Sequence, residues 1–457
     1  MWPAAFQSAA WFARDPCRPW TISSPRWWIM SPDSAKTPTA ESALLLACLQ
    51  RNFSMGAGEG GLSPSPAARH SESRGRAGPG AVPVAPDDPP QIAPVDWPAF
   101  LHLARSHRVL GLITRALAQC RRNIPPEIIL ELQAAHQASA LQTLFLVSRL
   151  LQLIKLLEDH GIAVIPFKGP ILAQEIFGDV ALRSVGDLDL LVRRENILAA
   201  RQLLVDRGYT PVFPRRVKRE EAYLQSLRGN RLDRYIRDHA EHHLASADGK
   251  VAVDLHWGIA LKEFALPLDM DRFWQNVRPS SLAGQAVRTM GVEDLLMVLC
   301  INGAKDCWPR LDRICDVAGV VAKYPQLDWR RLISDSRDGG IARIVAVTLS
   351  LARDLLHIPL PRDISDWIDG DMEAAQIASE IRPRLCLAAP EDDDAPGDLS
   401  RFTFQLRLRD RLPDRLRFVA AQFSPTVGDW AACPLPDQLR FLHYVIRPIR
   451  LMLNCSS

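Results

Sequence analysis

The sequence predicts an α+β protein in which a small mixed β-sheet with helices is embedded between N-terminal and C-terminal α-helical regions. Apolar residues recur at helical spacing before about residue 161 and again after residue 291, which predicts the two helical regions. Between them, short apolar runs end in glycine or alternate with polar residues, as strands do. The 457 residues, 47% of them hydrophobic, are enough for two or three domains with their own cores.

The N-terminal part divides by composition. Residues 1–37 are rich in Trp and Pro and lack the pattern of a signal peptide, so we interpret them as a disordered or overcalled extension, with Met30 or Met55 as alternative starts. A short helical segment is expected over 38–54. Residues 55–94 are dominated by Gly, Pro, Ser and Ala, and cannot bury enough apolar surface to offset the entropy lost on ordering. We predict a low-complexity linker there.

An N-terminal helical region is predicted over 95–160. Residues 96–117 place apolar side chains on one broad helical face. A second amphipathic run, 127–161, follows Pro125 and Pro126 and ends at Gly161, which suits a helix C-cap.

A mixed α/β unit is predicted over 161–275. A buried strand precedes a helix that ends at Gly178, and a second strand precedes a helix that ends at Gly208. Asp248-Gly249 is the turn signal of a hairpin between two alternating strands. The expected elements are 162–169, 170–178, 187–192, 194–208 and the hairpin 242–257.

A helical domain over 285–390 and a C-terminal loop and helical tail over 391–457 complete the prediction. The acidic run 391–398 is interpreted as a solvated loop. The segment 437–453 mixes Arg with apolar residues, so it is either a packed helix, which we favour, or a basic surface helix in peripheral contact with a membrane or a partner.

Charge and cysteine content limit the classes of function. A net charge of +3 gives no strong field that would favour nucleic acid as a partner. Nine cysteines without a CxxC pair fit a reducing cytoplasm, and no apolar run reaches the length of a membrane span. Cys300, Cys307 and Cys315 lie in an apolar helical pattern, where we expect small buried hydrophobes rather than zinc ligands.

Three aspartates lie on two predicted strands. Asp187 and Asp189 in 187-DLDLLV-192 share one strand face, because strand side chains alternate, and Asp254 in 251-VAVDLHW-257 has apolar neighbours on its opposite face. Carboxylates on one strand face repel each other unless a cation lies between them. If the two strands are neighbours, the three side chains form an oxygen-rich site suited to Mg²⁺ or Mn²⁺, with room for two ions about 4 Å apart.

Lys168-Gly169 lies where a strand meets the start of a helix. Glycine there lets backbone N–H groups approach an anion, and the helix N-terminus favours negative charge. Phosphate is the expected guest, with Lys168 and Arg183 within reach of it. Separately, each residue has a plainer interpretation, Lys168 as a solvated lysine and Gly169 as an ordinary turn.

Other polar residues have two interpretations each. His256 shares a face with Asp254 and either orients it or contacts a phosphate, or else is a satisfied core histidine. The cluster of His239, His242 and His243 invites a metal interpretation but lacks a fixed ligand geometry. The Arg-rich 215–221 has interleaved acids, so a solvated helix is expected rather than a nucleic-acid grip.

The order of these motifs resembles a family. Lys-Gly, a helix, Arg, Asp-x-Asp-Leu-Leu-Val and then Asp-Leu-His-Trp resemble the bacterial uncharacterised nucleotidyltransferase family, a branch of the DNA polymerase β-like nucleotidyltransferase superfamily. The resemblance extends from about residue 38 to the C-terminus, interrupted by the linker, and includes 302–318, 425–436 and 447–451. This chain departs from the pattern at Asn302 and Asp306, where many relatives have His in the helical domain.

The resemblance implies a nucleotidyltransferase fold over 161–275, in which Asp187, Asp189 and Asp254 bind two divalent metals and act in catalysis. It implies transfer of NMP from an NTP to an acceptor with release of pyrophosphate, with Lys168, Gly169 and Arg183 binding the nucleotide. The acceptor class stays open between a small molecule, a lipid-linked precursor and a protein. The alternative is a catalytically silent protein that binds a nucleotide or acts as a scaffold in a biosynthetic complex.

Overall fold

The structure is a computed structural model, and it describes residues 39–54, 95–119, 124–212, 236, 239–260, 262–387, 398–425, 429, 433, 435 and 437–447. The predicted extension over 1–37, the linker over 55–94 and the Arg-rich 215–221 lie outside the described residues, as does the acidic run up to residue 397.

A five-stranded mixed sheet forms the centre of the α/β unit. Its strand order is β1-β2-β5-β4-β3, in which β2 and β5 run parallel and the other neighbours are antiparallel. A separate pair of strands, β6 and β7, was not predicted from the sequence. The strands are β1 (Val164–Pro166), β2 (Asp187–Val192), β3 (Tyr209–Pro211), β4 (Glu241–Ser246), β5 (Ala252–His256), β6 (Arg278–Leu282) and β7 (Gln285–Thr289).

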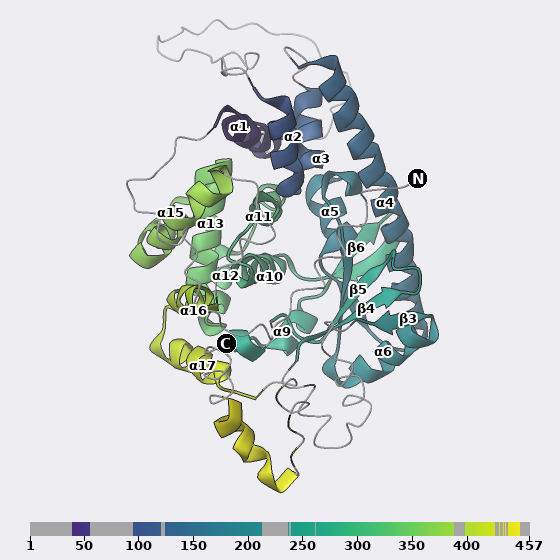
Figure 1. Cartoon of the computed structure of the whole chain (residues 1–457), viewed down its shortest axis with the longest axis vertical. Helices are drawn as coiled ribbons and strands as arrows, with labels where there is room; N and C mark the ends of the chain where they lie inside the picture. The colour runs from purple at the N-terminus through teal and green to yellow at the C-terminus, as the bar shows by residue number, and fades with distance from the viewer. Residues whose placement is uncertain are drawn as a thin grey trace, which may run out of the picture.

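Helices precede, flank and follow the sheet, which confirms the predicted α+β class (Figure 1). Those before and within the sheet are α1 (Ala40–Ser54), α2 (Trp97–Ser106), α3 (Leu110–Ala118), α4 (Pro126–Asp159), α5 (Gly169–Phe177), α6 (Ile197–Asp206) and α9 (Met270–Gln275). Those after it are α10 (Val292–Lys305), α11 (Leu311–Lys323), α12 (Trp329–Asp338), α13 (Ala342–Leu356), α14 (Arg362–Asp369), α15 (Met372–Leu387), α16 (Asp398–Arg407) and α17 (Leu412–Gln422). Short 3₁₀ turns are η4 (Val180–Leu182), η5 (Arg194–Asn196), η6 (Lys262–Phe264) and η7 (Asp437–Leu442).

The two faces of the sheet border different cores. Leu188 and Leu190 of β2 belong to a core that includes Leu150 and Leu157 of α4 and Leu204 of α6. Because side chains alternate along a strand, Leu191 lies on the opposite face, the one that carries Asp187 and Asp189. Leu191 belongs to the larger core built by the helical regions. The aspartates therefore lie on the face of the sheet that borders the larger core, opposite the face covered by α4 and α6.

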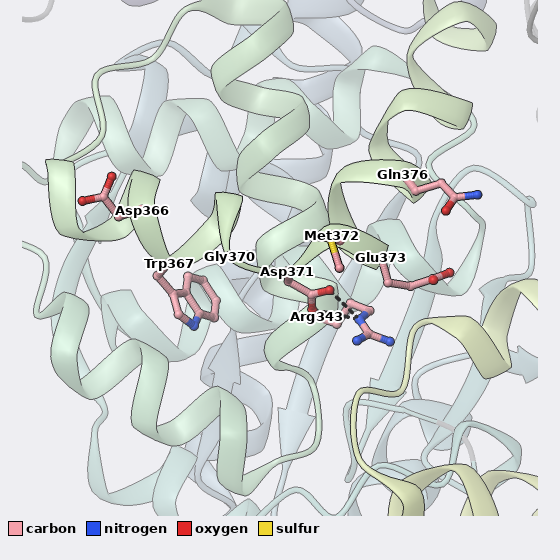
Figure 2. Close-up of a pocket in the computed structure, with 8 residues that line it drawn as sticks. All are labelled: Arg343, Asp366, Trp367, Gly370, Asp371, Met372, Glu373 and Gln376. Atoms are coloured by element: carbon pink, nitrogen blue, oxygen red, sulfur yellow. Dashed lines mark hydrogen bonds and ion pairs between the residues drawn. The ribbon is translucent and has the colours of Figure 1, made fainter.

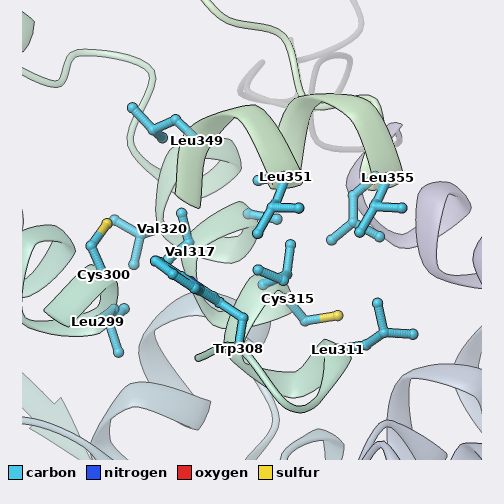
Figure 3. Close-up of a cluster of buried hydrophobic side chains, with 14 of the residues drawn as sticks. Leu299, Cys300, Trp308, Leu311, Cys315, Val317, Val320, Leu349, Leu351 and Leu355 are labelled. Atoms are coloured by element: carbon cyan, nitrogen blue, oxygen red, sulfur yellow. The ribbon is translucent and has the colours of Figure 1, made fainter. Parts of the chain in front are cut away.

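The larger core is centred on α10, α11 and α13. Trp308, which is almost fully buried, lies beside Cys300 and Cys315 within a shell of aliphatic side chains (Figure 3). Burial raises the pKa of the Cys300 thiol to about 12. These cysteines therefore lie in the apolar interior, as the expectation of small buried hydrophobes requires.

The helical pattern predicted over 96–117 is broken in the structure. The helix α2 ends at Ser106, Arg108 has a φ of 57°, and α3 begins at Leu110. A tertiary contact stabilises this break, since the ring Nδ1 of His107 accepts a hydrogen bond of 3.3 Å from the backbone N–H of Leu311. The apolar spacing continues across the break, so periodicity alone did not reveal it.

By length and composition alone, one described helix, α4, is apolar enough to cross a membrane, and 44% of its most apolar window is buried inside the protein. Its buried apolar side chains between Leu146 and Leu157 pack in the core behind the sheet, whereas Ile128 and Leu132 belong to the larger core. In the tail, His443 is buried while Phe441 and Tyr444 are exposed, and residues 448–453 lie outside the described part.

Candidate active site

The strands β2 and β5 bring the predicted aspartates together. In their parallel register Asp189 lies opposite Asp254, and Asp187 lies opposite Ala252. Carboxylate oxygens of Asp189 and Asp254 and a ring nitrogen of His256 all lie within 4.8 Å of one another. Both the strand adjacency and the common face expected from the sequence are present.

Lys168 makes an ion pair with Asp189. Its Nζ donates to Asp189 Oδ1 at 2.7 Å, and the two side chains are 14% and 4% exposed. Burial by itself raises the pKa of Asp189, but the Lys168 charge and the contact with His256 outweigh burial and hold it below the usual range. Lys168 is therefore not a solvated surface lysine.

His256 is buried between two carboxylates. Its Nε2 lies 3.1 Å from Asp189 Oδ1, and its Nδ1 lies 3.1 Å from Glu241 Oε2. Burial lowers the pKa of His256, and the contacts with Asp189 and Glu241 overcome this and raise it. Among the aspartates, its hydrogen-bonding partner is thus Asp189 rather than Asp254.

Glu241 is a site residue that sequence reasoning missed, and His243 was considered only as part of a histidine cluster, not as a partner of Asp254. The antiparallel register of β4 and β5 places His243 opposite Asp254 and Glu241 opposite His256. His243 Nδ1 lies 2.7 Å from Asp254 Oδ1, and although burial lowers its pKa, this hydrogen bond raises it to about 9. The predicted turn at Asp248-Gly249 contained the signal, because counting back from it pairs 243 with 254.

The three histidines considered together in the sequence do not converge on one ligand site. His242 alternates with His243 on β4, so it lies on the opposite sheet face, where its ring packs 4.8 Å from that of Trp257. Burial lowers the pKa of His242 to about 3, so its ring is neutral at physiological pH.

The pKa of Asp187 reflects its burial and the repulsion among the carboxylates of the cluster. Burial, followed by the charges of Asp189 and Asp254, raises its pKa to about 6. Several carboxylates together on one strand face are the donor set that hard divalent cations prefer, and a cation would relieve their repulsion. The residues present therefore fit a divalent metal ion.

Gly169 lies close to the backbone of the strand that carries the aspartates. Its φ is 60°, and a Cβ there would lie 3.2 Å from the carbonyl oxygen of Asp187. Gly169 also begins α5, with Lys168 at the N-cap position. Glycine is required at this position because both the left-handed conformation and the short distance disfavour a side chain.

Arg183 has a different neighbour from the one expected. Its Nε and Nη2 donate to the two carboxylate oxygens of Asp316 at 2.8 and 2.9 Å. The side chains are 12% and 3% exposed, so the pair is buried. This bidentate contact links the segment before β2 to α11, and it makes Arg183 a structural link between the sheet and the helical region.

A surface hollow of about 840 Å³ lies away from the aspartates, on α13, α14 and α15 (Figure 2). Among the charged side chains that line it, Arg343 donates from Nε to a carboxylate oxygen of Asp371 at 2.8 Å. Its Nη1 donates to the carbonyl oxygen of Arg407 at 2.9 Å. The guanidinium is therefore occupied by groups of the protein itself, and the hollow offers no chemistry comparable to that of the sheet.

Comparison with known families agrees with this geometry. A family model described as an uncharacterised nucleotidyltransferase matches residues 93–357, which is more than half of the chain. The chain belongs to the uncharacterised nucleotidyltransferase family. The matched region includes all three aspartates and both Lys168 and Gly169, so the uncharacterised nucleotidyltransferase family shares the part of the chain that forms the site. Searches of curated proteins and of solved structures gave no match.

Proposed function

We propose that the protein is a divalent-metal-dependent nucleotidyltransferase that transfers NMP from an NTP to an acceptor and releases pyrophosphate. The observation that carries the proposal is the convergence of Asp189 and Asp254, which lie opposite each other on two parallel neighbouring strands and share their sheet face with Asp187. Membership of a nucleotidyltransferase family supports the reaction class, and the resemblance to the DNA polymerase β-like superfamily supports the in-line mechanism.

In this proposal Asp187, Asp189 and Asp254 would hold Mg²⁺ or Mn²⁺. When bound, such ions neutralise phosphate charge and make an acceptor hydroxyl more acidic. Asp254 accepts the proton of that hydroxyl, the acceptor oxygen forms a bond to the α-phosphorus, and the bond to the bridging oxygen breaks as pyrophosphate leaves. His243, 2.7 Å from Asp254, holds this carboxylate in place.

Lys168 and Gly169 are the residues that would bind the nucleotide. Because Lys168 neutralises Asp189 in the structure, its ammonium group would have to leave this carboxylate if Asp189 held a divalent ion. Displaced from Asp189, the ammonium is free to contact the triphosphate at the N-terminus of α5. Lys168 thus links occupation of the carboxylates to binding of the nucleotide.

The same ion pair is the observation that favours the second candidate function, a catalytically silent nucleotide-binding or scaffolding protein. A lysine that neutralises a would-be metal ligand stabilises the cluster without any metal.

Pyrophosphate release separates the two candidates. We expect the purified protein, incubated with a mixture of NTPs, Mg²⁺ and cell extract as a source of acceptor, to release pyrophosphate. Asp254→Asn should lower the rate about 10³-fold, since the lost charge stabilisation amounts to several kcal/mol. NTP binding without pyrophosphate above the Asp254→Asn level would favour the silent protein.

A further inference from the structure

Arginines from two separate helical segments are brought together by contacts between those segments. Arg108 lies between α2 and α3, while Arg310 and Arg313 lie at the start of α11. His107 joins these segments through two hydrogen bonds of 3.3 Å. Its ring Nδ1 accepts one from the backbone N–H of Leu311, and its carbonyl oxygen accepts the other from the backbone N–H of Asp312. The charges of Arg108 and Arg313 both act on the carboxylate of Asp187.

Both turns that position these arginines contain backbone in the left-handed region. Arg108 has a φ of 57°, and Cys307 and Trp308, just before Arg310, have φ values of 58° and 48°. Residues other than glycine rarely adopt this region, and such residues cluster where the surrounding structure imposes them for function. Trp308 is fixed in place against Gly303, where an added Cβ would lie only 2.4 Å from the indole nitrogen.

The carboxylates around the arginines do not engage all of them equally. Arg310 Nε lies 3.4 Å from Asp312, whereas the nearest carboxylate contact of Arg313 is Asp306, at 3.9 Å. In the described part of the chain, the Nε of Arg313 is buried and has no hydrogen-bond partner. Burial lowers the pKa of Arg313, and the charges of Asp312 and Asp306 outweigh it and raise the pKa. The Nε donor still lacks a hydrogen bond, which the oxygen of a bound anion would supply.

The charge balance shifts further when the proposed metal site is occupied. Without metal, the charge of Asp187 offsets part of the positive charge of the arginines. A divalent ion on Asp187 would engage that charge, and the arginines would then face an excess of positive charge in a low-dielectric region. An anion bound there together with the metal restores the balance.

We propose that Arg313, with Arg108 and Arg310, forms a phosphate-binding subsite beside Asp187, built by the helical region rather than by the loop at Lys168-Gly169. Guanidinium groups bind phosphate oxygens through bidentate, charge-assisted hydrogen bonds. The phosphate belongs either to the triphosphate of the NTP or to a phosphorylated acceptor. The inference rests on the proposed function, since it places the subsite at the same metal cluster.

Binding of inorganic tripolyphosphate to the full-length protein, measured by calorimetry with Mg²⁺, tests the subsite. We expect Arg313→Gln to weaken binding about tenfold or more, the effect of one charge-assisted contact. Arg330→Gln, on an exposed position of α12, is the matched control and should bind as the wild type does. Equal affinities of Arg313→Gln and the wild type would overturn the proposal.

A measurement on the wild type covers the case in which Arg313→Gln fails to fold. Phenylglyoxal modifies accessible guanidinium groups, and mass spectrometry locates the modified arginines. Tripolyphosphate should slow modification of Arg313 and leave Arg330 unchanged. Modification of Arg313 at the same rate with and without tripolyphosphate would contradict the subsite.

Two further arms separate the source of the phosphate and the fate of the proposed function. If a saturating non-hydrolysable NTP analogue displaces tripolyphosphate, the subsite holds the NTP; if both bind together, it holds a phosphorylated acceptor. Metal-dependent NTP binding that is lost in Asp187→Asn, together with tripolyphosphate binding that is unchanged in Arg313→Gln, would remove the subsite and leave the proposed function standing. Tripolyphosphate binding that depends on Arg313 but not on any metal at Asp187 would support the subsite and count against the proposed metal-dependent function.

Discussion

Asp187→Asn should make the metal-free protein more stable while abolishing nucleotidyl transfer. The pKa of Asp187 is raised to about 6, above the unfolded value, so its ionised form destabilises the fold. The contribution of Asp187 to stability is fully present below about pH 4 and is lost as the pH rises through 6. At pH 7.5 the variant should gain about 2 kcal/mol in the free energy of unfolding, measured by denaturant titration in EDTA.

The gain should depend on pH and on metal. It should vanish near pH 4, where the Asp187 carboxyl is protonated, and Mn²⁺ should stabilise the wild type but not the variant. Asp271→Asn is the matched control, because it removes the same charge from a side chain that is 81% exposed. The neighbour of Asp271 is a cation, Arg193 at 3.6 Å, and not another carboxylate. If Asp187→Asn is no more stable than the wild type at pH 7.5, the carboxylates do not repel one another as we describe.

Asp316→Ala should destabilise the protein by about 3–5 kcal/mol, because it leaves Arg183 buried without its partner. Equilibrium unfolding of the two proteins measures the difference. The matched control is Asp369→Ala, because Asp369 also forms an ion pair of 2.8 Å with an arginine, Arg353. That pair lies at the surface, with the Asp369 side chain 59% exposed and the Arg353 side chain 27% exposed. There we expect a loss of at most about 1 kcal/mol.

Similar losses in Asp316→Ala and Asp369→Ala would contradict the structural role of the buried pair. The double variant Arg183→Met with Asp316→Leu should recover most of the lost stability, because no charge is then left unpaired. Its NTP affinity decides whether Arg183 also binds the nucleotide: an unchanged affinity assigns Arg183 to structure alone.

The strand pattern of the sequence was sufficient to locate the aspartates. The run DLDLLV is short and apolar, and its alternation puts Asp187 and Asp189 on one face whatever its neighbours are. That β5 lies directly beside β2 could be expected from the similar pattern around Asp254, and the register then brings Asp189 and Asp254 together. Local periodicity is a reliable guide here because the buried leucines leave one register available.

The partners of these residues depend on tertiary contacts, which periodicity does not contain. Arg183 lies four residues before Asp187, so proximity in sequence suggested a shared anion, yet Asp316 of α11 is its partner. Lys168 was expected either to contact a phosphate or to be a solvated lysine, and its contact with Asp189 became visible only in the folded chain. The break at Arg108 likewise depends on the contact between His107 and α11.

Calorimetric titration of a non-hydrolysable NTP, with and without Mn²⁺, tests the central claim most directly. The account predicts that the wild type binds the NTP with an affinity that rises when Mn²⁺ is present, and that Asp187→Asn and Asp254→Asn each lose about tenfold or more of that metal-dependent gain. Asp271→Asn should keep it. Metal-dependent binding that is unchanged in both aspartate variants would contradict the assignment of these carboxylates to the metal.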